Sequence, residues 1–226
     1  GYIRIVEFRE TTPGDLEDAI SKIRSQGMDS LIIDLRNNPG GLLEIAIRAT
    51  EMFIEPGKII VYTKGRTPDQ NLEFTSRNKN PYLDWPMVIL VNEGSASGSE
   101  IMAGALQDYK RAIILGTKTF GKGSVQTVIP LSDGSALRLT TSRYFTPSGK
   151  IIHEKGIEPD ITVELITEYK TEKTESKTQK REEMFDGLEE KIDQEIPRDY
   201  QKDNQLMRAV DLLKGIKVYS KTRDEK

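Results

Sequence analysis

The chain has 226 residues, of which 36% are hydrophobic, and this is enough to bury a substantial core. Its 33 basic and 36 acidic side chains leave a formal net charge of −3, which gives no reason to expect a nucleic-acid partner. Because it has no cysteine and one histidine, His153, thiol catalysis, disulfides and sites with several cysteine or histidine ligands for a metal are excluded.

The first part of the chain predicts strands that alternate with helices. Five runs have the length and apolar content of strands: residues 2–8, 31–35, 58–63, 87–91 and 112–116. Three runs carry apolar side chains at helical spacing: residues 16–23, 42–53 and 100–109. A helix between two strands implies a crossover connection and therefore a sheet with parallel pairs. The fold class is thus α/β, and no apolar run approaches the roughly 18 residues that a membrane span needs.

The second part becomes rich in strands and then changes in composition. Residues 125–130 and 136–141 predict a hairpin around Ser132-Asp133-Gly134, whereas residues 167–183 are almost all charged or polar. Two amphipathic runs follow, the first around Phe185, Leu188 and Ile192 and the second around Leu206, Ala209, Val210 and Leu213, which we expect Gly215 to end. We expect three regions: a core at 1–166, a charged linker or exposed helix at 167–183, and a helical appendage at 184–226.

A serine-rich turn and a lysine in a glycine-flanked turn are the candidates for nucleophilic chemistry. Ser97 lies in a hydroxyl-rich run after the most apolar strand, and its hydroxyl needs a base to become a nucleophile. A lysine can serve if burial lowers its pKa from about 10.4 to about 7–8. Lys122 stands between two glycines, although an isolated lysine in such a turn is more often solvated. The spacing of a phosphate-binding P-loop is not met there. His153 is the alternative base, although nothing local favours it.

The run Asn-Asn-Pro-Gly-Gly at 37–41 follows a strand and precedes a helix. Its two glycines, Gly40 and Gly41, allow backbone N–H groups to face outward, so this turn is a candidate for holding an oxyanion. The alternative interpretation is an ordinary tight connection between a strand and a helix.

Three segments together resemble the C-terminal processing peptidases, also called tail-specific proteases: residues 34–41, 92–101 and 116–123. Residues 144–149 and 155–160 match further segments of that family in the same order. The resemblance covers roughly residues 1–165 and implies a crotonase-like core of repeated strand-strand-helix units.

The resemblance also implies roles for individual residues. The family nucleophile falls on Ser97, the family base on Lys122, and the glutamine that orients this lysine on Gln126. The oxyanion hole would be formed by the amide of Gly98 and by that of either glycine in the turn at 37–41, without a choice between Gly40 and Gly41. Gly98 stands where many members have alanine, and we expect it to loosen the turn.

The implied function is a serine endopeptidase that cleaves near the C-termini of protein substrates through a Ser-Lys dyad and an acyl-enzyme, without metal or cofactor. Family resemblance implies an extracytoplasmic location, in the bacterial periplasm or cell envelope. Family members usually carry a PDZ domain before this core, and nothing in the sequence resembles one. Because the sequence starts at Gly1 without a signal peptide or an initiator methionine, we expect a fragment or a processed form.

Two other classes of protein remain open at this point. One is a non-catalytic module that binds peptides or other ligands on the same fold, and the other is an acyl-CoA enzyme, because an oxyanion hole also suits thioesters. The appended helices are candidates for homo-oligomer contacts, with simple coverage of the core as the alternative.

Overall fold

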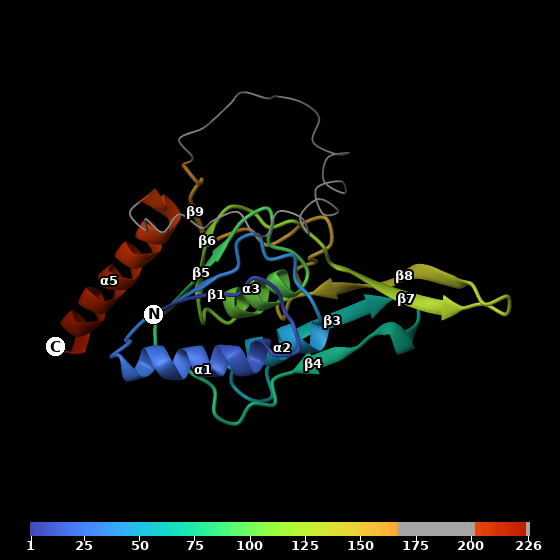
Figure 1. Ribbon diagram of the computed structural model, residues 1–226, viewed down its shortest axis with the longest axis horizontal. Helices are drawn as coiled ribbons and strands as arrows, with labels where there is room; N and C mark the ends of the chain where they lie inside the picture. The colour runs from blue at the N-terminus through green and yellow to red at the C-terminus, as the bar shows by residue number, and fades with distance from the viewer. Residues whose placement is uncertain (167–201, 225–226) are drawn as a thin grey trace.

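The computed structural model describes residues 1–166 and 202–224, and Figure 1 shows its strands and helices. The helices are α1 (Thr12–Ser25), α2 (Leu43–Glu51), α3 (Gly98–Asp108) and α5 (Asn204–Asp224), with a short 3-10 helix η1 (Pro68–Gln70). The strands are β1 (Tyr2–Arg4), β2 (Leu31–Asp34), β3 (Ile59–Gly65), β4 (Glu73–Thr75), β5 (Met87–Val91), β6 (Ile113–Gly116), β7 (Ser124–Pro130), β8 (Ala136–Phe145) and β9 (Ile161–Thr162).

The first sheet has five strands in the order β1-β2-β5-β6-β9, and all four pairs are parallel. The predicted α/β class with parallel pairs is therefore confirmed. In a parallel sheet the carboxyl ends of neighbouring strands meet at one edge, which is where α/β proteins place their ligand sites. The segments after β2, β5 and β6 are the three turns that the sequence singled out, so the fold brings them together.

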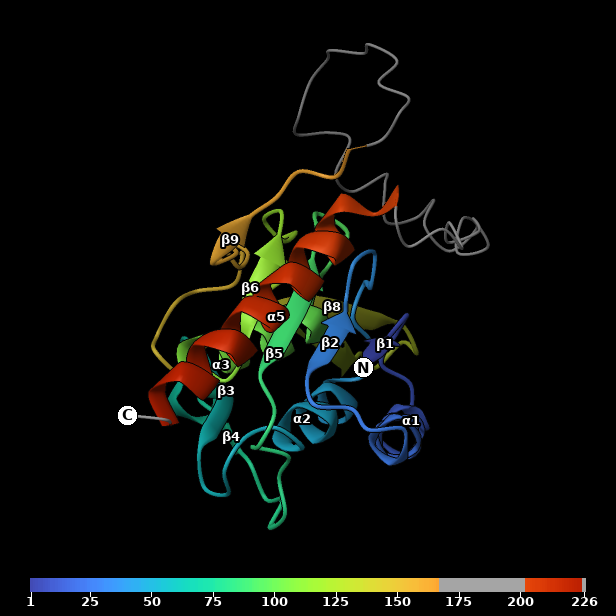
Figure 2. The ribbon, with the colours of Figure 1, turned by 90° about the vertical axis from the view of Figure 1, so that its left-hand side faces the viewer.

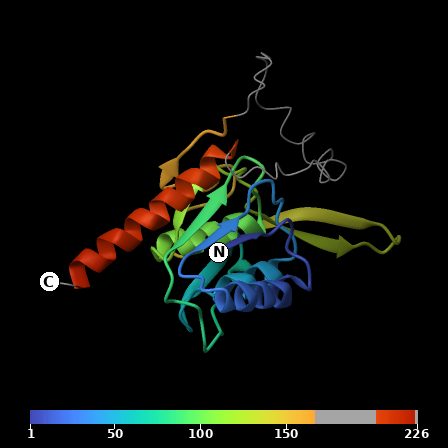
Figure 3. The ribbon, with the colours of Figure 1, turned by 60° about the vertical axis from the view of Figure 1, so that its left-hand side comes forward.

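Helices cover both faces of this sheet because its central strands are apolar on both sides. Alternate residues point in opposite directions: Leu31 and Ile33 pack in the larger core cluster beside α1, α2 and α3, whereas Ile32 belongs to a second cluster under α5. Figure 2 shows α5 crossing in front of the sheet, and Figure 3 shows α1 and α2 on its other side. The C-terminal helix thus completes a three-layer arrangement.

The second sheet is antiparallel, with the strand order β4-β3-β8-β7. Its β7–β8 hairpin matches the predicted one and extends well away from the body in Figure 1. Several large apolar side chains are exposed on it: Val128, Ile129, Leu131, Leu137 and Leu139. The hairpin begins at Ser124, two residues after Lys122, so its base lies next to the lysine turn.

The C-terminal helix corrects one prediction. Gly215 does not end it, since α5 continues to Asp224. A glycine inside a helix costs only about 1 kcal/mol relative to alanine, and burial of Leu206 and Leu213 against the sheet offsets that cost. The predicted helix around Phe185 and the linker at 167–183 lie outside the described residues. Among the described helices, none combines the length and apolar character that crossing a bilayer requires.

Candidate active site

Hydrogen bonds join the turn after β2 to the turn after β5. The N–H of Ala96 donates to the carbonyl of Asn38 over 2.9 Å, and the N–H of Asn37 donates to Oδ1 of Asn92 over 2.8 Å. The Asn92 side chain donates in return to Oδ1 of Asn37 over 2.8 Å. The glycine turn and the serine turn are therefore one interlocked unit at the carboxyl edge of the parallel sheet.

Ser97 occupies the position directly before α3 and adopts an unusual backbone conformation. Its φ of 52° and ψ of −110° lie outside the regions that non-glycine residues normally populate. Such strain costs of order 1–3 kcal/mol, persists only where the surroundings enforce it and is concentrated at functional sites. The residue is half-buried, so its side chain is partly accessible to solvent.

The two flanking serines have structural roles instead. Ser95 and Ser99 are both fully buried. The hydroxyl of Ser95 donates to the carbonyl of Leu35 over 2.8 Å, and that of Ser99 donates to the carbonyl of Asn38 over 2.9 Å. These two hydroxyls hold the turns together, which leaves Ser97 as the partly exposed serine of the run.

Gly40 lies directly against the serine turn. A Cβ atom at this position would stand 2.8 Å from Cβ of Ser97 and 2.8 Å from the nitrogen of Gly98, and its φ of +104° is unfavourable for other residues. Only glycine allows the two backbones to approach so closely. The turn at 37–41 is thus more specialised than an ordinary strand-to-helix connection.

The amides of Gly40 and Gly41 differ in their hydrogen bonds. The N–H of Gly40 donates to Oδ1 of Asn38 over 2.9 Å. Gly41 pairs with Phe8 in a parallel bridge, but the hydrogen bonds of this bridge go to the residues on either side of Gly41. The N–H of Phe8 donates to the carbonyl of Gly40, and the carbonyl of Phe8 accepts from the N–H of Leu42. Within the described residues the N–H of Gly41 has no acceptor, so it is the glycine amide available to a ligand.

Gly98 supplies a second available amide. As the first residue of α3 it has no acceptor inside the helix for its N–H, and the positive end of the helix dipole lies there. The expected loosening of the turn at Gly98 is not what the packing indicates. A Cβ atom would stand 2.9 Å from Cβ of Ala46 and 3.1 Å from the ring of Phe8, so the backbone is tightly enclosed.

Glu100 connects the serine turn to the lysine turn. Its carboxylate is fully buried and accepts four hydrogen bonds. Oε2 accepts from the N–H of Ser97 over 2.9 Å and from that of Lys122 over 2.8 Å, while Oε1 accepts from the hydroxyl of Thr119 over 2.6 Å and the N–H of Gly121 over 2.7 Å. Burial raises the pKa of this carboxyl, and the four hydrogen bonds oppose the rise.

Sequence reasoning gave Glu100 no role, although a local signal for it exists. A serine followed three residues later by glutamate is a capping-box pattern, in which the glutamate reaches back to the N–H of the capping residue. The structure has this backward contact, since the Glu100 carboxylate accepts from the N–H of Ser97. Its bonds to Gly121 and Lys122 bridge more than twenty positions of sequence and leave no local trace.

Lys122 and Gln126 are both exposed. The burial that a lysine base needs is therefore not present at Lys122 in this structure. Gln126 lies on β7, just after an irregularity in the pairing with β8. The lysine turn itself is tightly enclosed by the segment that follows β8, because a Cβ atom on Gly123 would stand 2.4 Å from the nitrogen of His153.

His153 thus lies close to the lysine turn, although 31 positions separate it from Lys122 in the sequence. Its side chain is 26% exposed, and its Nε2 lies 3.8 Å from Oε1 of Glu154. Its Nδ1 is buried and makes no hydrogen bond to the described residues. The histidine is the alternative candidate base.

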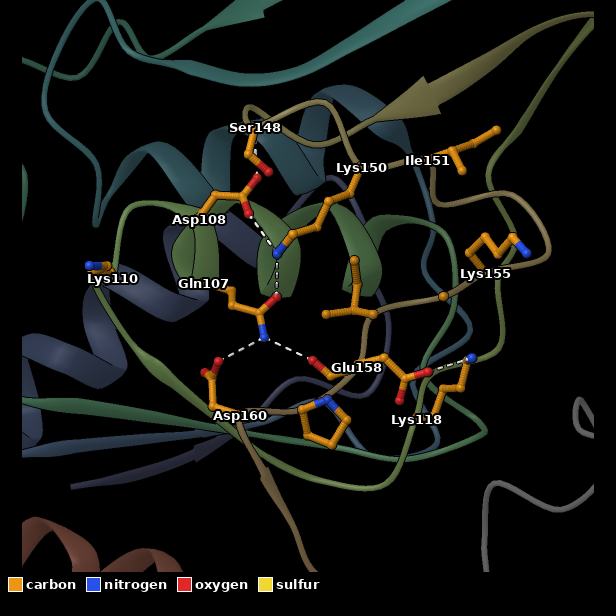
Figure 4. A pocket seen from close by; sticks show the side chains of 13 residues that line it. Gln107, Asp108, Lys110, Lys118, Ser148, Lys150, Ile151, Lys155, Glu158 and Asp160 are labelled. Carbon is orange, nitrogen blue, oxygen red and sulfur yellow. Dashed lines mark hydrogen bonds and ion pairs between the residues drawn. The ribbon is translucent and has the colours of Figure 1, made fainter.

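A cavity of about 810 Å³ lies at the other end of α3 from Ser97 (Figure 4). Lys150 pairs there with Asp108 at 3.1 Å, and Lys118 pairs with Glu158 at 2.5 Å. Gln107 donates to the carbonyl of Glu158 and to Oδ1 of Asp160. None of the candidate catalytic residues lines this cavity. Its polar groups join the end of α3 to Glu158 and Asp160.

The hydroxyl of Thr119 connects the backbone of Ile157 to the carboxylate of Glu100. Its hydroxyl accepts from the N–H of Ile157 over 2.7 Å and donates to Oε1 of Glu100. The described residues contain no cluster of three or more histidine, cysteine, aspartate or glutamate side chains that could hold a metal ion.

Comparisons with known proteins place this geometry in context. The sequence model of peptidase family S41 matches residues 1–163. A carboxy-terminal-processing protease of Bartonella bacilliformis is 44% identical over an alignment 226 residues long. This alignment covers 95% of this chain and 52% of that protein. The structure of a photosystem II D1 C-terminal processing protease is 36% identical with a TM-score of 0.68, over 73% of this chain and 42% of that chain.

A third similarity concerns the fold alone. A solved structure from Bacteroides fragilis is 18% identical, has a TM-score of 0.67 and covers 96% of this chain and 54% of its own. The chain spans about half the length of these relatives.

Proposed function

The chain belongs to peptidase family S41, and from this premise we propose that it is a serine endopeptidase that cleaves polypeptides near their C-terminal ends. The observation that carries the proposal is the single oxygen of Glu100 that binds the backbone N–H groups of both Ser97 and Lys122. This contact keeps a hydroxyl-bearing turn beside an amine-bearing turn, which is what nucleophilic catalysis by a serine requires.

In the proposed reaction, neutral Lys122 accepts the proton from the hydroxyl of Ser97 while Oγ attacks a peptide carbonyl carbon. The tetrahedral intermediate collapses, and the leaving amine takes the proton from the lysine. Water then attacks the acyl-enzyme with its proton passing to Lys122, and Oγ of Ser97 leaves as a hydroxyl by taking that proton back from Lys122, which frees the carboxylic acid product. Gln126 is proposed to orient the lysine.

The oxyanion is proposed to bind the amides of Gly98 and Gly41. Gly98 contributes the first N–H of α3, where the helix dipole favours negative charge. Gly41 is favoured over Gly40 because the N–H of Gly40 already donates to Asn38. Gly40 then serves the site through its lack of a side chain, which lets the glycine turn contact Ser97.

Because Lys122 is exposed, we propose that the bound substrate shields it from water. An ammonium group in water has a pKa near 10.4, which is too high for a base at neutral pH. We propose that a bound polypeptide covers the lysine and excludes water, because desolvation disfavours the charged form of an amine. The free chain would then contain a resting lysine that is activated on binding.

The preference for C-terminal regions and an extracytoplasmic location are further parts of the proposal. The preference for C-terminal regions is supported by the name of the Bartonella relative, a carboxy-terminal-processing protease; the location is supported by the family resemblance alone. Cleavage sites mapped by mass spectrometry on one unfolded polypeptide, with and without an appended C-terminal tag, would test the first. Fractionation of cells that produce the protein would test the second.

The experiment that tests the core of the proposal compares Ser97→Ala with Ser132→Ala, a matched change at an exposed serine of the hairpin turn. We expect the chain and Ser132→Ala to degrade an unfolded polypeptide and to be labelled by a serine-acylating inhibitor. Ser97→Ala should do neither. An inert wild-type chain that still binds peptide would favour the non-catalytic binding module instead.

A further inference from the structure

Helix α5 lies beyond residue 163, where the match to the family model ends. It covers the second face of the five-stranded sheet, as Figure 2 shows. Its buried side chains pack against alternate residues of three strands; the cluster comprises Ile32, Val88, Leu90, Leu115, Leu206, Ala209 and Leu213. This apolar contact explains why the helix docks but does not explain the polar contacts at its beginning.

The beginning of α5 binds a buried arginine. Arg36 lies two residues after the end of β2, and its side chain is only 11% exposed. Its guanidinium makes two forked contacts. Nε and Nη2 bind the carboxylate of Asp34 over 2.9 and 2.6 Å, while Nη1 and Nη2 bind that of Asp203 over 3.0 and 2.7 Å.

Gln205 uses the remaining capacity of the arginine. Its Oε1 accepts from Nη1 of Arg36 over 2.9 Å, and its amide donates to the carbonyl of Val163 over 2.7 Å. All five N–H donors of the guanidinium are therefore engaged, three of them by residues 203 and 205. Bidentate pairs of this kind fix orientation as well as adding energy.

Arg36 is also the residue immediately before the glycine turn. Its own N–H donates to Oδ1 of Asp34 over 3.0 Å, so its backbone is held at the end of β2. The next residue, Asn37, has a φ of 58° and binds Asn92 in the serine turn. A displacement of Arg36 would therefore pass directly to the turn that carries Gly40 and Gly41.

We propose that α5 is a latch: Asp203 and Gln205 fix Arg36, and through it the glycine turn at 37–41, in the geometry that the active site needs. The effect that we expect on kcat rests on the proposed function, whereas the effect on the structure of the glycine turn does not. Arg36, Asp203 and Gln205 are positioning residues, since they act through the turn. Undocking of α5 loosens the glycine turn and its amides.

The decisive variant is Asp203→Asn. Asp203 is also the cap of α5, because its Oδ1 accepts from the N–H of Leu206 over 2.9 Å. Asparagine caps helices as well as aspartate does, so this variant removes the charge and one arm of the fork while it keeps the helix start. Arg36 stays paired with Asp34 and is not left as an unpaired buried charge. Asp211→Asn, an exposed change on the same helix, is the matched control.

The structural readout is amide hydrogen exchange of the whole chain, measured on peptides that contain residues 36–42. Loss of a hydrogen bond to a charged group should raise exchange there on the order of tenfold in Asp203→Asn. Asp211→Asn should match the wild type. Unchanged exchange at 36–42 in Asp203→Asn, with α5 itself exchanging faster, would overturn the latch and leave α5 as a cover of the sheet.

The kinetic readout separates the latch from the proposed function. On an unfolded polypeptide, Asp203→Asn should lower kcat about tenfold with KM unchanged, because the glycine amides act on the transition state. An unchanged kcat would also overturn the latch. If the wild-type chain does not cleave, the proposed function fails, and the exchange comparison alone decides on the latch.

Discussion

The backbone N–H groups of Ser97 and Lys122 donate to one and the same oxygen, Oε2 of Glu100. The two nitrogens can therefore be no further apart than the sum of these two hydrogen bonds, 2.9 and 2.8 Å. The relative position of the candidate nucleophile and base is thus set by the buried carboxylate of a third residue. The two turns are thus joined through backbone N–H groups that share one carboxylate oxygen.

Glu100→Gln should disrupt the hydrogen bonds of the site although glutamine has nearly the same size and shape as glutamate. An amide has one acceptor oxygen, so the nitrogen that replaces the other oxygen must face two donors. We expect a loss of about 1–3 kcal/mol in the free energy of unfolding and a fall in kcat on the order of 10²-fold, because small misplacements of reacting groups are costly. Glu93→Gln, an exposed change in the same turn, is the control. Wild-type kcat in a folded Glu100→Gln variant would contradict this account.

The sequence predicted the parts of the site but not the contacts that assemble them. Glycine- and serine-rich runs after apolar strands indicated three turns, and the parallel sheet predicted from β-α-β order is what makes them meet. The four hydrogen bonds of Glu100 and the proximity of His153 to Gly123 depend on segments far apart in sequence. The exposure of Lys122 likewise depends on what the fold leaves uncovered.

Gly40→Ala should abolish activity and destabilise the chain. Alanine at a positive φ costs roughly 1–2 kcal/mol, and here its Cβ would also stand 2.8 Å from Ser97 and Gly98. Gly134→Ala separates the two effects, because Gly134 has a φ of +84° but open space around it. We expect chemical denaturation to show the larger loss for Gly40→Ala and protease assays to show normal turnover for Gly134→Ala. Equal losses of stability would mean that the close packing at Gly40 is unimportant.

Lys122→Met and His153→Gln should distinguish the two candidate bases. Methionine keeps the length of the lysine side chain but has no amine, so cleavage should fall by at least the 10²–10⁴-fold that general base catalysis contributes. His153→Gln keeps a polar side chain beside Gly123 and should cleave normally. Turnover of an unfolded polypeptide at pH 7 and pH 9 measures both. The reverse result, an inactive His153→Gln and an active Lys122→Met, would assign the base to the histidine.

The docking of α5 should weaken in acid. Burial acts to raise the pKa of Asp203, but the hydrogen bonds and charge of Arg36 outweigh it and hold this pKa below its ordinary value. A lowered pKa in the folded state means that the ion pair stabilises the chain above the unfolded pKa of about 3.9 and is lost as the pH falls through the folded value. The other groups that face Arg36 and Asp34 are Tyr2, which stays neutral because burial and Asp34 raise its pKa, and uncharged Gln205.

The measurement compares the free energy of unfolding of the wild type and of Asp203→Asn from pH 2 to pH 7. Other carboxyl groups titrate alike in both proteins, so their contributions cancel in the difference. We expect the wild type to be more stable by about 1–3 kcal/mol above pH 5 and the difference to shrink towards zero below about pH 3.9 as Asp203 takes up a proton. Because asparagine retains the helix cap, a difference that persists unchanged at pH 2 would show that the charge of Asp203 does not hold α5 on Arg36.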